Sequence, residues 1–433
     1  MDKIDFKKIN KIHFIGIGGI GISAIARMLL LQGKNITGTD ISLSQVTDEL
    51  ENAGAVIHQG QSLDMVPKDA ELIVYTAAIE VADPELFGAI KKLDIPSISY
   101  SEALGIYSKD KKTIAISGTH GKTTTTAMLA KILLDSKTDP SVIVGSLLIE
   151  NKTNYVAGKG EYLVVEADEY RRSFLSLYPR ILVINNIDSD HLDYFKDIKD
   201  VQSAFASLAN RVPEDGAIVC DLNNENIKKV LHGVKAKIYD YNEIDISNVV
   251  MTFPGEHNRQ NAKSALCVAK VLGIDLAMAK KSIENFKGTW RRFELKGKTN
   301  GGALVYDDYA HNPQKVRSAI AGAREMYPNK KILAVFQPHL FSRTKFLLKE
   351  FSESFAQADD VILLPIYPAR EAFDPSINSD MLADLLQKKD VSVCVAKNIE
   401  DASKIINNKI FDICLIMGAG DITALGDILV KKN

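Results

Sequence analysis

The chain has 433 residues, of which 46% are hydrophobic and 25% charged, and a formal net charge of −2 leaves no basic footprint for nucleic acid. No run of about 18 apolar residues predicts a membrane span, and the N-terminus has no cleavage site of a secretory signal. The four cysteines fit neither a zinc pattern nor a disulfide framework, so we expect a cytoplasmic protein with reduced thiols and, from its length, about three domains.

Short apolar runs rich in β-branched residues alternate with helical patterns along most of the chain, which is typical of parallel sheets with crossover helices. The first block opens with a strand over 11–17 and a helix over 21–33, for which Gly33 is a suitable C-cap. Further strands follow over 35–40 and 71–79.

Polar residues at 108–112 mark the end of the first block. The second block starts with a strand, a glycine turn and a helix over 113–136, and the third starts near residue 288. We therefore predict an α/β fold of three consecutive α/β domains, over 1–109, 110–288 and 289–433. The remaining elements expected are strands over 161–169, 180–191, 303–313, 331–339, 360–367, 391–396 and 412–421, and helices over 257–273 and 276–286.

Residues 115–126 read AISGTHGKTTTT, a strand that breaks into a glycine turn and a helix. Such a turn aims backbone N–H groups at an anion, helped by the positive end of the helix dipole. Lys122 can reach the outer phosphates of a nucleotide, and the Thr123 hydroxyl can ligate Mg²⁺. The longer ATP loop has a glycine where this chain has Ile116. A polar turn that happens to contain Gly-Lys-Thr is the alternative, but its context favours phosphate binding.

Acidic groups follow two strands of the same block, and parallel strands end at a shared crevice. A solvated loop charge is an equally good interpretation of any single one of these residues. Thr123, Glu166 and His191 together, however, predict a metal site beside the phosphate loop. The groups that end the two strands are Glu166, Asp168, Glu169, Asp188, Asp190, His191 and Asp193.

A second glycine loop, in HFIGIGGIGISAIA, contains Gly16, Gly18 and Gly21, and Asp40 ends the next strand. This is nearly the fingerprint of NAD-binding proteins, including its ribose-binding acid. The loop recognises a diphosphate, however, and a UDP-sugar carries the same diphosphate and a ribose. A protein with this loop and a separate ATP loop would most simply join two substrates.

At this point the chain resembles the Mur ligase family, and most closely its alanine-adding branch. The resemblance extends from residue 12 to about residue 423. It rests on motifs that occur in the family's order: HFIGIGGIGISAIA, GTHGKTTTT, EADEYRRSFL, NIDSDHLDYF, HNRQNA, GTWRRFE, DDYAHNP, FQPHLFSRT and MGAGDIT.

The resemblance implies a Rossmann-like domain that binds a UDP-sugar, a central P-loop domain that binds ATP and Mg²⁺, and a Rossmann-like C-terminal domain that binds the amino acid. The implied reaction is the ATP-dependent joining of L-alanine to the lactyl carboxylate of UDP-N-acetylmuramate through an acyl phosphate, in peptidoglycan precursor synthesis. All implied partners are small molecules, and a monomer and a weak dimer both stay open. The family's short G-T-x-G-K-T loop also accounts for Ile116.

The resemblance further implies the roles of individual residues. The catalytic residues would be Lys122, Glu166, His191 and Arg292, and the metal ligands Thr123, Glu166 and His191. ATP would contact Gly118, Thr119, His120, Gly121, Lys122, Thr123, Thr124, His257, Asn258, Asn261, Arg292 and Asp308. The UDP-sugar would contact Gly16, Gly18, Gly19, Ile20, Gly21, Ser23, Asp40 and Thr76. The amino acid would contact Tyr309, His311, His339 and Arg343.

Three departures from the family pattern bear on specificity. Leu340 stands where many members have an arginine beside the amino-acid site, and Arg171 stands where an aspartate is usual beside the metal-binding strand. The helix at 200–211 lacks the modified lysine of several sister ligases, which favours alanine addition.

Three other functions stay open. A related ligase attaches a preformed tripeptide to the same sugar nucleotide, although FQPHLFSRT argues against it. An NAD-binding oxidoreductase would explain the first loop but not the second. A catalytically silent nucleotide-binding scaffold would fit the departures at Leu340 and Arg171.

Overall fold

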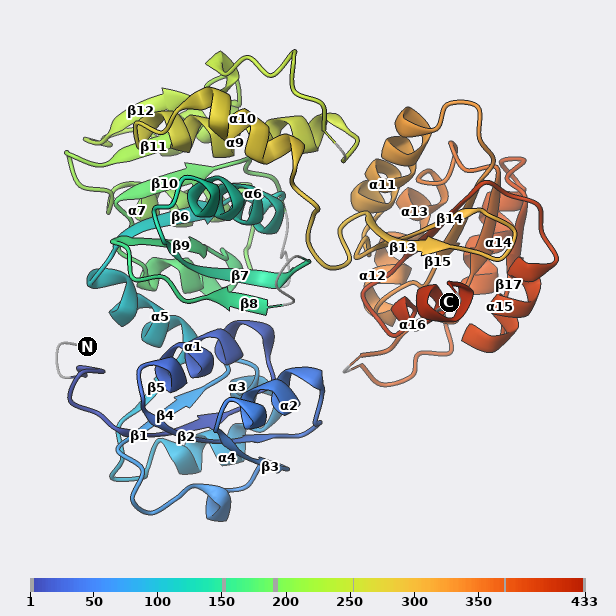
Figure 1. Cartoon of the computed structure of the whole chain (residues 1–433). Helices are drawn as coiled ribbons and strands as arrows, with labels where there is room; N and C mark the ends of the chain where they lie inside the picture. Colours follow the sequence, from blue (N-terminus) through green and yellow to red (C-terminus); the bar gives the residue numbers. More distant parts are fainter. Residues whose placement is uncertain (1–3, 150–152, 190–193, 252, 370, 431–433) are drawn as a thin grey trace. The chain divides into compact units, whose positions relative to one another are not determined.

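Figure 1 shows the computed structural model of the chain, in which three β-sheets with covering helices are described. The α/β class is therefore confirmed. The chain divides into two compact units, Met1–Val250 with Arg259–Lys287, and Met251–Asn258 with Gly288–Asn433. The exact boundaries of the three predicted domains stay a prediction. The structure describes residues 4–149, 153–189, 194–251, 253–369 and 371–430.

The first sheet has five parallel strands in the order β3-β2-β1-β4-β5. The order reverses between β1 and β4, and ligands of open α/β sheets bind at the carboxyl ends of the strands at such a point. The strands are β1 (Lys11–Ile15), β2 (Asn35–Asp40), β3 (Val56–Gln59), β4 (Leu72–Tyr75) and β5 (Ser97–Ser99). The helices are α1 (Ile20–Leu31), α2 (Gln45–Asn52), α3 (Ile79–Ala82), α4 (Pro84–Ile90) and α5 (Tyr100–Lys109).

Helix α1 ends one residue earlier than its glycine suggested. The C-cap is Gln32, and Gly33 follows it with φ +78. The left-handed conformation is the one for which a glycine after a helix is suited, so the prediction was right in kind and wrong by one position.

The second sheet, also in the first unit, has the order β12-β11-β10-β6-β9-β7-β8 and is parallel except for the pair β7–β8. Strand β6 pairs with β10 and β9, which brings the ends of all three strands together. The strands are β6 (Lys112–Ser117), β7 (Ser141–Leu148), β8 (Thr153–Val156), β9 (Tyr162–Glu166), β10 (Ile181–Ile184), β11 (Ala217–Cys220) and β12 (Lys237–Asp240). The helices are α6 (Lys122–Asp135), α7 (Ile198–Ala209), α8 (Glu225–Val230), α9 (Glu256–Val271) and α10 (Leu276–Glu284).

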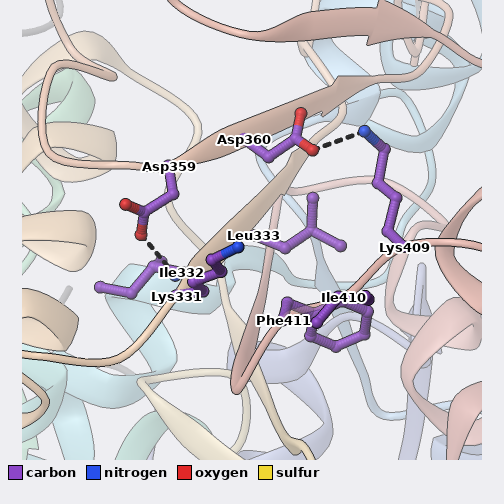
Figure 2. A pocket seen from close by; sticks show the side chains of 8 residues that line it. All are labelled: Lys331, Ile332, Leu333, Asp359, Asp360, Lys409, Ile410 and Phe411. Atoms are coloured by element: carbon purple, nitrogen blue, oxygen red, sulfur yellow. Dashed lines mark hydrogen bonds and ion pairs between the residues drawn. The ribbon is translucent and has the colours of Figure 1, made fainter.

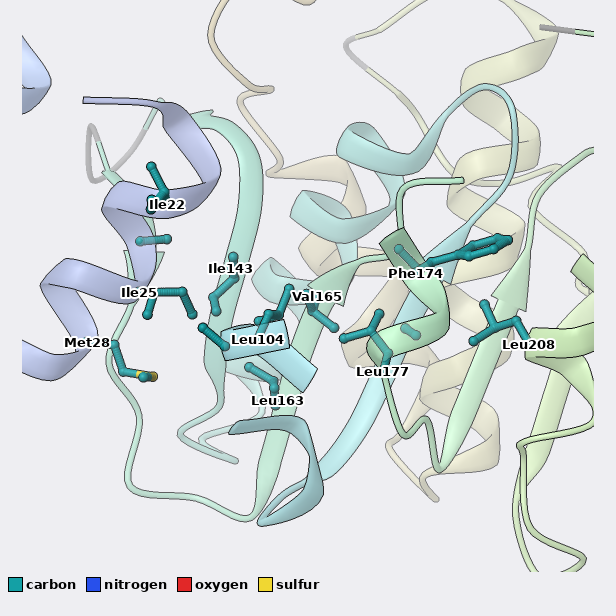
Figure 3. Close-up of a cluster of buried hydrophobic side chains, with 14 of the residues drawn as sticks. Ile22, Ile25, Met28, Leu104, Ile143, Leu163, Val165, Phe174, Leu177 and Leu208 are labelled. Carbon is teal, nitrogen blue, oxygen red and sulfur yellow. The ribbon is translucent and has the colours of Figure 1, made fainter. Parts of the chain in front are cut away.

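A continuous apolar core joins the two sheets of the first unit (Figure 3). Ile22 and Ile25 of α1 belong to the same buried cluster as Ile143 of β7 and Val165 of β9, and the cluster extends to Leu208 of α7. Helix α1 begins directly after the first glycine loop, and β9 ends in the acidic residues. The two candidate binding segments therefore adjoin one apolar core within the first unit.

The second unit contains a six-stranded sheet in the order β13-β14-β18-β15-β16-β17, with β13 antiparallel to β14. Buried clusters cover both of its faces, as expected of parallel strands with almost continuous apolar sequences. The strands are β13 (Glu294–Lys298), β14 (Leu304–Asp308), β15 (Ile332–Phe336), β16 (Asp360–Leu363), β17 (Val393–Val395) and β18 (Ile413–Met417). The helices are α11 (Pro313–Met326), α12 (Phe341–Phe346), α13 (Leu348–Ser352), α14 (Ser379–Gln387), α15 (Ile399–Asn407) and α16 (Thr423–Leu429).

Candidate active site

The predicted phosphate loop lies between β6 and α6, which begins at Lys122. Gly118 has φ +132 and Gly121 has φ +82, so both adopt a backbone conformation that favours glycine. A Cβ atom at Gly121 would also lie 2.2 Å from Oδ1 of Asn261. The loop therefore needs these glycines for their conformation and, at position 121, for space.

The segment after β10 holds the tip of this loop. The side-chain amide of Asn186 accepts the N–H of His120 at 2.8 Å and donates to the carbonyl of His120 at 3.2 Å. The N–H of Thr119 donates to the backbone carbonyl of Asn186 at 3.1 Å. Two loop amides are thus directed at protein oxygens, and a phosphate would be left to the amides from Gly121 onward. Sequence reasoning gave Asn186 no role, although its motif was recognised.

Lys122 already contacts anionic groups of the protein. Its Nζ atom lies 2.7 Å from Oε2 of Glu169, 2.7 Å from the carbonyl of Gly118 and 3.9 Å from Oδ1 of Asp168. Burial alone would lower the pKa of Lys122, but the two carboxylates outweigh it and raise that pKa above its ordinary value. The ammonium is therefore charged at neutral pH and can attract the outer phosphates of a nucleotide.

Two of the three predicted metal ligands lie together. The Thr123 hydroxyl is 3.3 Å from Oε2 of Glu166, whose Oε1 accepts the N–H of Gly145 at 2.8 Å. A hydroxyl and a carboxylate are hard oxygen donors, and they suit Mg²⁺ with phosphate oxygens completing the shell. His191, the third predicted ligand, lies outside the described residues.

Asn261 contacts the protein interior beneath the phosphate loop. Its Oδ1 accepts from the Thr125 hydroxyl at 3.2 Å, which in turn accepts from Asn185 at 3.0 Å. His257 and Asn258 stand at the other side of the division between the compact units, inside α9. The amide of Asn258 donates to the Pro254 carbonyl at 2.7 Å. Contact of these three residues with ATP stays a prediction.

The first glycine loop differs from a dinucleotide fingerprint in the role of its acid. The N–H of Gly18 donates to Oδ2 of Asp40 at 2.8 Å, and the N–H of Ser42 donates to Oδ1 at 3.1 Å. In the fingerprint the acid is available to a ribose, whereas here it is bonded to the loop itself. Gly16, with φ +76, packs against Thr76, whose Cγ2 would lie 2.5 Å from a Cβ atom at Gly16.

Helix α1 is held by residues that sequence reasoning did not select. A Cβ atom at Gly21 would lie 2.8 Å from the ring of Tyr100, at the start of α5. The pKa of Tyr100 is raised by burial and by Glu166 and Asp168, so its ring lies in the field of the acidic motif as well. A tyrosine after a short strand was the one signal in the sequence, and it is a weak one.

Ser23 and Ile20, predicted UDP-sugar contacts, interact with the second sheet. The amide of Asn154 in β8 donates to the Ser23 hydroxyl at 2.9 Å and to the carbonyl of Ile20. Ser23 is fully buried. The predicted roles of Ser23, Ile20 and Gly19 toward the UDP-sugar stay predictions.

The second unit brings the four predicted amino-acid-binding residues together. The ring of His311 lies 5.2 Å from that of Tyr309 and 6.2 Å from that of His339, and Nη1 of Arg343 is 3.4 Å from Nδ1 of His339. Tyr367, which sequence reasoning missed, stacks on His339 at 5.7 Å. The family resemblance implied this grouping, and the structure places Tyr309 and His339 just after the carboxyl ends of β14 and β15.

His311 has a partly buried, neutral imidazole. Burial, with the nearby charges of Lys315 and Arg343, lowers the pKa of His311 well below its usual range, so the ring is neutral at neutral pH. Its Nδ1 lies 2.8 Å from the carbonyl oxygen of Tyr309, which can only accept. Nδ1 therefore carries the hydrogen, and Nε2 has the lone pair.

Arg292 and Asp308 lie in the same unit. The guanidinium of Arg292 is 5.4 Å from the ring centroid of Tyr309. The Asp308 carboxylate accepts the N–H groups of Phe293 and Ala310, each at 2.8 Å, and burial raises the pKa of Asp308 despite the opposing charge of Arg292. Their predicted contact with ATP stays a prediction.

Arg291 organises this region, although sequence reasoning assigned a role only to its neighbour. Its guanidinium pairs with the buried Asp307, Nε to Oδ2 at 3.4 Å, and donates to the carbonyls of Gly418 and Gly420. The Arg291 carbonyl accepts the N–H of Tyr309 at 2.7 Å. One side chain thus ties the motifs TWRRF, DDYAHNP and GAGD together.

Leu340, the departure noted in FQPHLFSRT, has a strained backbone with φ +71. Its N–H donates to the Tyr367 carbonyl at 2.9 Å, and its own carbonyl accepts from the Thr344 hydroxyl at 2.8 Å. These bonds hold the start of α12, which carries Arg343, in place.

A cavity of about 240 Å³ lies elsewhere in the second unit (Figure 2). Its walls come from the starts of β15 and β16 and from the segment before β18, and an ion pair between Lys409 and Asp360 borders it. The predicted amino-acid site is at the opposite ends of these strands. The cavity is therefore not the candidate active site. The residues lining it are Lys331, Ile332, Leu333, Asp359, Asp360, Lys409, Ile410 and Phe411.

Known proteins are similar to this chain over almost its whole length. A protein from Clostridium tetani, named UDP-N-acetylmuramate–L-alanine ligase, is 41% identical over 457 aligned positions, which cover 99% of each chain. This chain belongs to the Mur ligase family. Three family models match it: the catalytic domain at 11–112, the middle domain at 116–247 and the glutamate ligase domain at 291–420.

Two further Mur ligases show how far the similarity extends. A protein of the same name from Caldanaerobacter subterraneus is 40% identical, with 100% of this chain and 99% of the relative covered. The crystal structure of the UDP-N-acetylmuramate-alanine ligase MurC from Thermotoga maritima matches with a TM-score of 0.81 at 27% identity, over 97% of this chain and 98% of that one. No helix within the described residues of this Mur ligase is long and apolar enough to cross a membrane.

Proposed function

We propose that this Mur ligase joins L-alanine to the lactyl carboxylate of UDP-N-acetylmuramate with the cleavage of ATP, in peptidoglycan precursor synthesis. The observation that carries the proposal is the full-length match to relatives of that name at about 40% identity. The site agrees with it, because one unit holds a phosphate loop and a glycine loop, while the other groups the predicted amino-acid-binding residues.

The first step proposed is the activation of the carboxylate. A carboxylate is a poor electrophile, so its oxygen attacks the γ-phosphorus of ATP, ADP leaves, and an acyl phosphate forms. Lys122 would stabilise the charge that develops on the transferred phosphoryl group. Thr123 and Glu166, with His191, would hold Mg²⁺, which supplies charge neutralisation at the phosphates when bound.

Lys122 must change partners in this step. Glu169 and a nucleotide phosphate would both bind the ammonium of Lys122, which lies 2.7 Å from Glu169. Movement of Lys122 from Glu169 toward the phosphates would therefore accompany ATP binding.

The second step proposed is attack by the amine of alanine on the acyl carbon. A tetrahedral intermediate collapses, and inorganic phosphate leaves with the oxygen that came from the carboxylate. The amine must lose a proton first, and Nε2 of the neutral His311 can accept a hydrogen bond that orients the amine toward the acyl carbon. Arg343 would bind the carboxylate of alanine, which is the natural partner of a guanidinium.

We infer that the enzyme works in the cytoplasm, where UDP-sugars and ATP are available, and that its metal is Mg²⁺. Domains over 1–109, 110–288 and 289–433 would bind the UDP-sugar, ATP and alanine, respectively. The oligomeric state is left as monomer or weak dimer.

The test is phosphate release by the purified protein with ATP, Mg²⁺ and UDP-N-acetylmuramate, and with alanine, glycine, serine or a preformed tripeptide as the amine. We expect alanine to support the highest kcat/KM. Faster turnover with the tripeptide would replace this proposal by the recycling ligase, and no release with any amine would overturn both. Tight stoichiometric binding of NAD would revive the oxidoreductase.

A further inference from the structure

Arg171 follows the acidic motif at the end of β9 and has an unusual backbone. Its φ is +52, and the next residue, Arg172, has φ +57. Residues other than glycine rarely adopt this conformation, and they persist there when surrounding contacts hold them. Arg171 and Arg172 contact different partners, and these contacts hold each residue in its backbone conformation.

Arg171 reaches the part of the first unit that carries the first sheet. Its Nη1 atom is 3.0 Å from Oε2 of Glu80 in α3 and 3.5 Å from the carbonyl oxygen of Ala77. Both side chains of the ion pair are about one-third exposed, at 31% and 35%. Arg171 thus links the metal-binding strand of the second sheet to the segment 76–80.

Segment 76–80 begins at Thr76, which packs against the first glycine loop. Thr76 follows β4 directly, and its N–H donates to the carbonyl of Ile15 at 3.0 Å, one residue before the loop begins. The Thr76 methyl carbon would lie 2.5 Å from a Cβ atom at Gly16. A shift of this segment would therefore alter the position of the first glycine loop, where the diphosphate is expected to bind.

The charge of Glu80 makes its partner matter. Glu80 lies four residues after Thr76, which contacts the loop, so without a paired cation its charge would disfavour a diphosphate bound there, and screening by water reduces this effect. Arg171 supplies that cation and, through its contact with the Ala77 carbonyl, also restrains the backbone of segment 76–80.

We propose that Arg171 is a positioning residue for the UDP-sugar: it neutralises Glu80 and holds segment 76–80 against the first glycine loop. This inference rests on the proposed function for the identity of the substrate. It concerns the binding of the sugar nucleotide and leaves ATP binding to the phosphate loop.

Arg172 provides a matched control within the chain. It shares the left-handed backbone, and its Nη2 lies 2.5 Å from Oδ1 of Asp200 in α7, with side-chain exposures of 31% and 27%. Arg172 therefore matches Arg171 in residue type, backbone conformation and ion pairing, but its partner lies in a helix that belongs to the second sheet. Loss of its charge should leave the first loop unchanged.

The experiment compares four variants with the parent enzyme: Arg171→Asp, Glu80→Arg, the double variant that carries both, and Arg172→Asp. For Arg171→Asp we expect the KM for UDP-N-acetylmuramate to rise about five- to tenfold, while the KM for ATP stays within about twofold. The double variant restores an ion pair of reversed sign and should return the KM for the sugar nucleotide to within about twofold of the parent value.

Three results would overturn the proposal: an unchanged sugar-nucleotide KM in Arg171→Asp, an equal rise in Arg172→Asp, or no recovery in the double variant. Thermal melting of each variant separates misfolding from a binding defect, and the milder pair Arg171→Met and Arg172→Met replaces the two aspartate variants if either does not fold. If the parent enzyme shows no turnover with any amino acid, the proposed function fails. Calorimetric binding of UDP-N-acetylmuramate to the same variants then tests the role of Arg171 by itself.

Discussion

The two glycine loops of the first unit follow the same plan but are held in opposite ways. Each connects a parallel strand to a helix, and each contains glycine with positive φ, at Gly16 in the first loop and at Gly118 and Gly121 in the second. In the first loop, the N–H of Gly18 is bonded to the carboxylate of Asp40 at 2.8 Å. In the second, the N–H of His120 is bonded to the neutral amide of Asn186 at 2.8 Å, and Lys122 adds a positive charge.

This difference shows why a glycine pattern alone does not define a ligand. The carboxylate of Asp40 adds a negative charge beside an anion bound at the first loop, whereas the ammonium of Lys122 favours a highly charged anion at the second loop once it turns from Glu169 toward that anion. The second loop is thus suited to a triphosphate during phosphoryl transfer. The first is suited to a diphosphate that only has to be held, and its acid is bonded to its own backbone.

The sharpest way to break the comparison is to remove the positive charge of the second loop. Lys122→Ala should lower kcat about a thousandfold, because the charge on the transferred phosphoryl group loses its nearest cation. Binding of UDP-N-acetylmuramate, measured by calorimetry, should stay within about twofold of the parent affinity. Lys131→Ala is the matched control, since Lys131 lies on the same helix and pairs with Asp135 at 2.7 Å. Equal losses in both variants would contradict the assignment.

We expect the stability of the protein to fall in acid because of His13, which lies in β1, the strand that precedes the first loop. Burial, helped by His58, lowers the pKa of His13 in β1 from 6.5 to about 4. The unfolded chain therefore binds a proton that the folded chain excludes between these values. This contribution to stability is complete above the unfolded pKa and is lost as the pH falls toward the folded one.

The apparent free energy of unfolding should consequently fall by about 2 kcal/mol from this one group between about pH 7.5 and about pH 5. His13→Gln, whose amide can keep the bond to Thr37, should remove that part of the pH dependence in chemical denaturation. His232→Gln, at an exposed position, should keep it. The same acid sensitivity in all three proteins would show that His13 is not its source.

The contribution of Asn186, whose neutral side-chain amide is bonded to the second loop, can be tested separately. Asn186→Ala removes both bonds to the backbone of His120, at 2.8 and 3.2 Å, and should lower kcat/KM for ATP about tenfold. The KM for the UDP-sugar should not change. Asn226→Ala is the control, because Asn226 donates to the neighbouring Ile187 carbonyl at 2.9 Å. An effect on the sugar nucleotide as large as that on ATP would argue for general destabilisation.

The smallest expected effect concerns the acid of the first loop. Asp40→Ala removes the acceptor of the Gly18 N–H and should raise the KM for UDP-N-acetylmuramate about fivefold, which is the value of one ordinary hydrogen bond. Asp40→Asn keeps an acceptor oxygen and should stay within about twofold of the parent. If Asp40→Asn were as impaired as Asp40→Ala, the charge of Asp40 would be required, as expected of an acid that binds a ribose.

Much of the fold could be predicted, because the strands that position the site are short, apolar and followed by recognisable turns. The phosphate loop and Glu166 came from strand ends in a parallel sheet, whereas the grouping of Tyr309 with His339 came from the family resemblance. The roles of Asn186, Arg291 and Tyr100 could not be predicted. Each depends on which carbonyl or ring a side chain meets after folding, and an asparagine or arginine in a loop looks the same in sequence whether it is buried or solvated.

The acyl phosphate is the central chemical claim, and isotope transfer tests it most directly. UDP-N-acetylmuramate labelled with ¹⁸O in its lactyl carboxylate would be incubated with the enzyme, ATP, Mg²⁺ and alanine, and the released phosphate analysed by mass spectrometry. If the carboxylate attacks the γ-phosphate, the phosphate formed with the amide carries one ¹⁸O from the sugar nucleotide. Unlabelled phosphate, formed together with the amide product, would contradict the account.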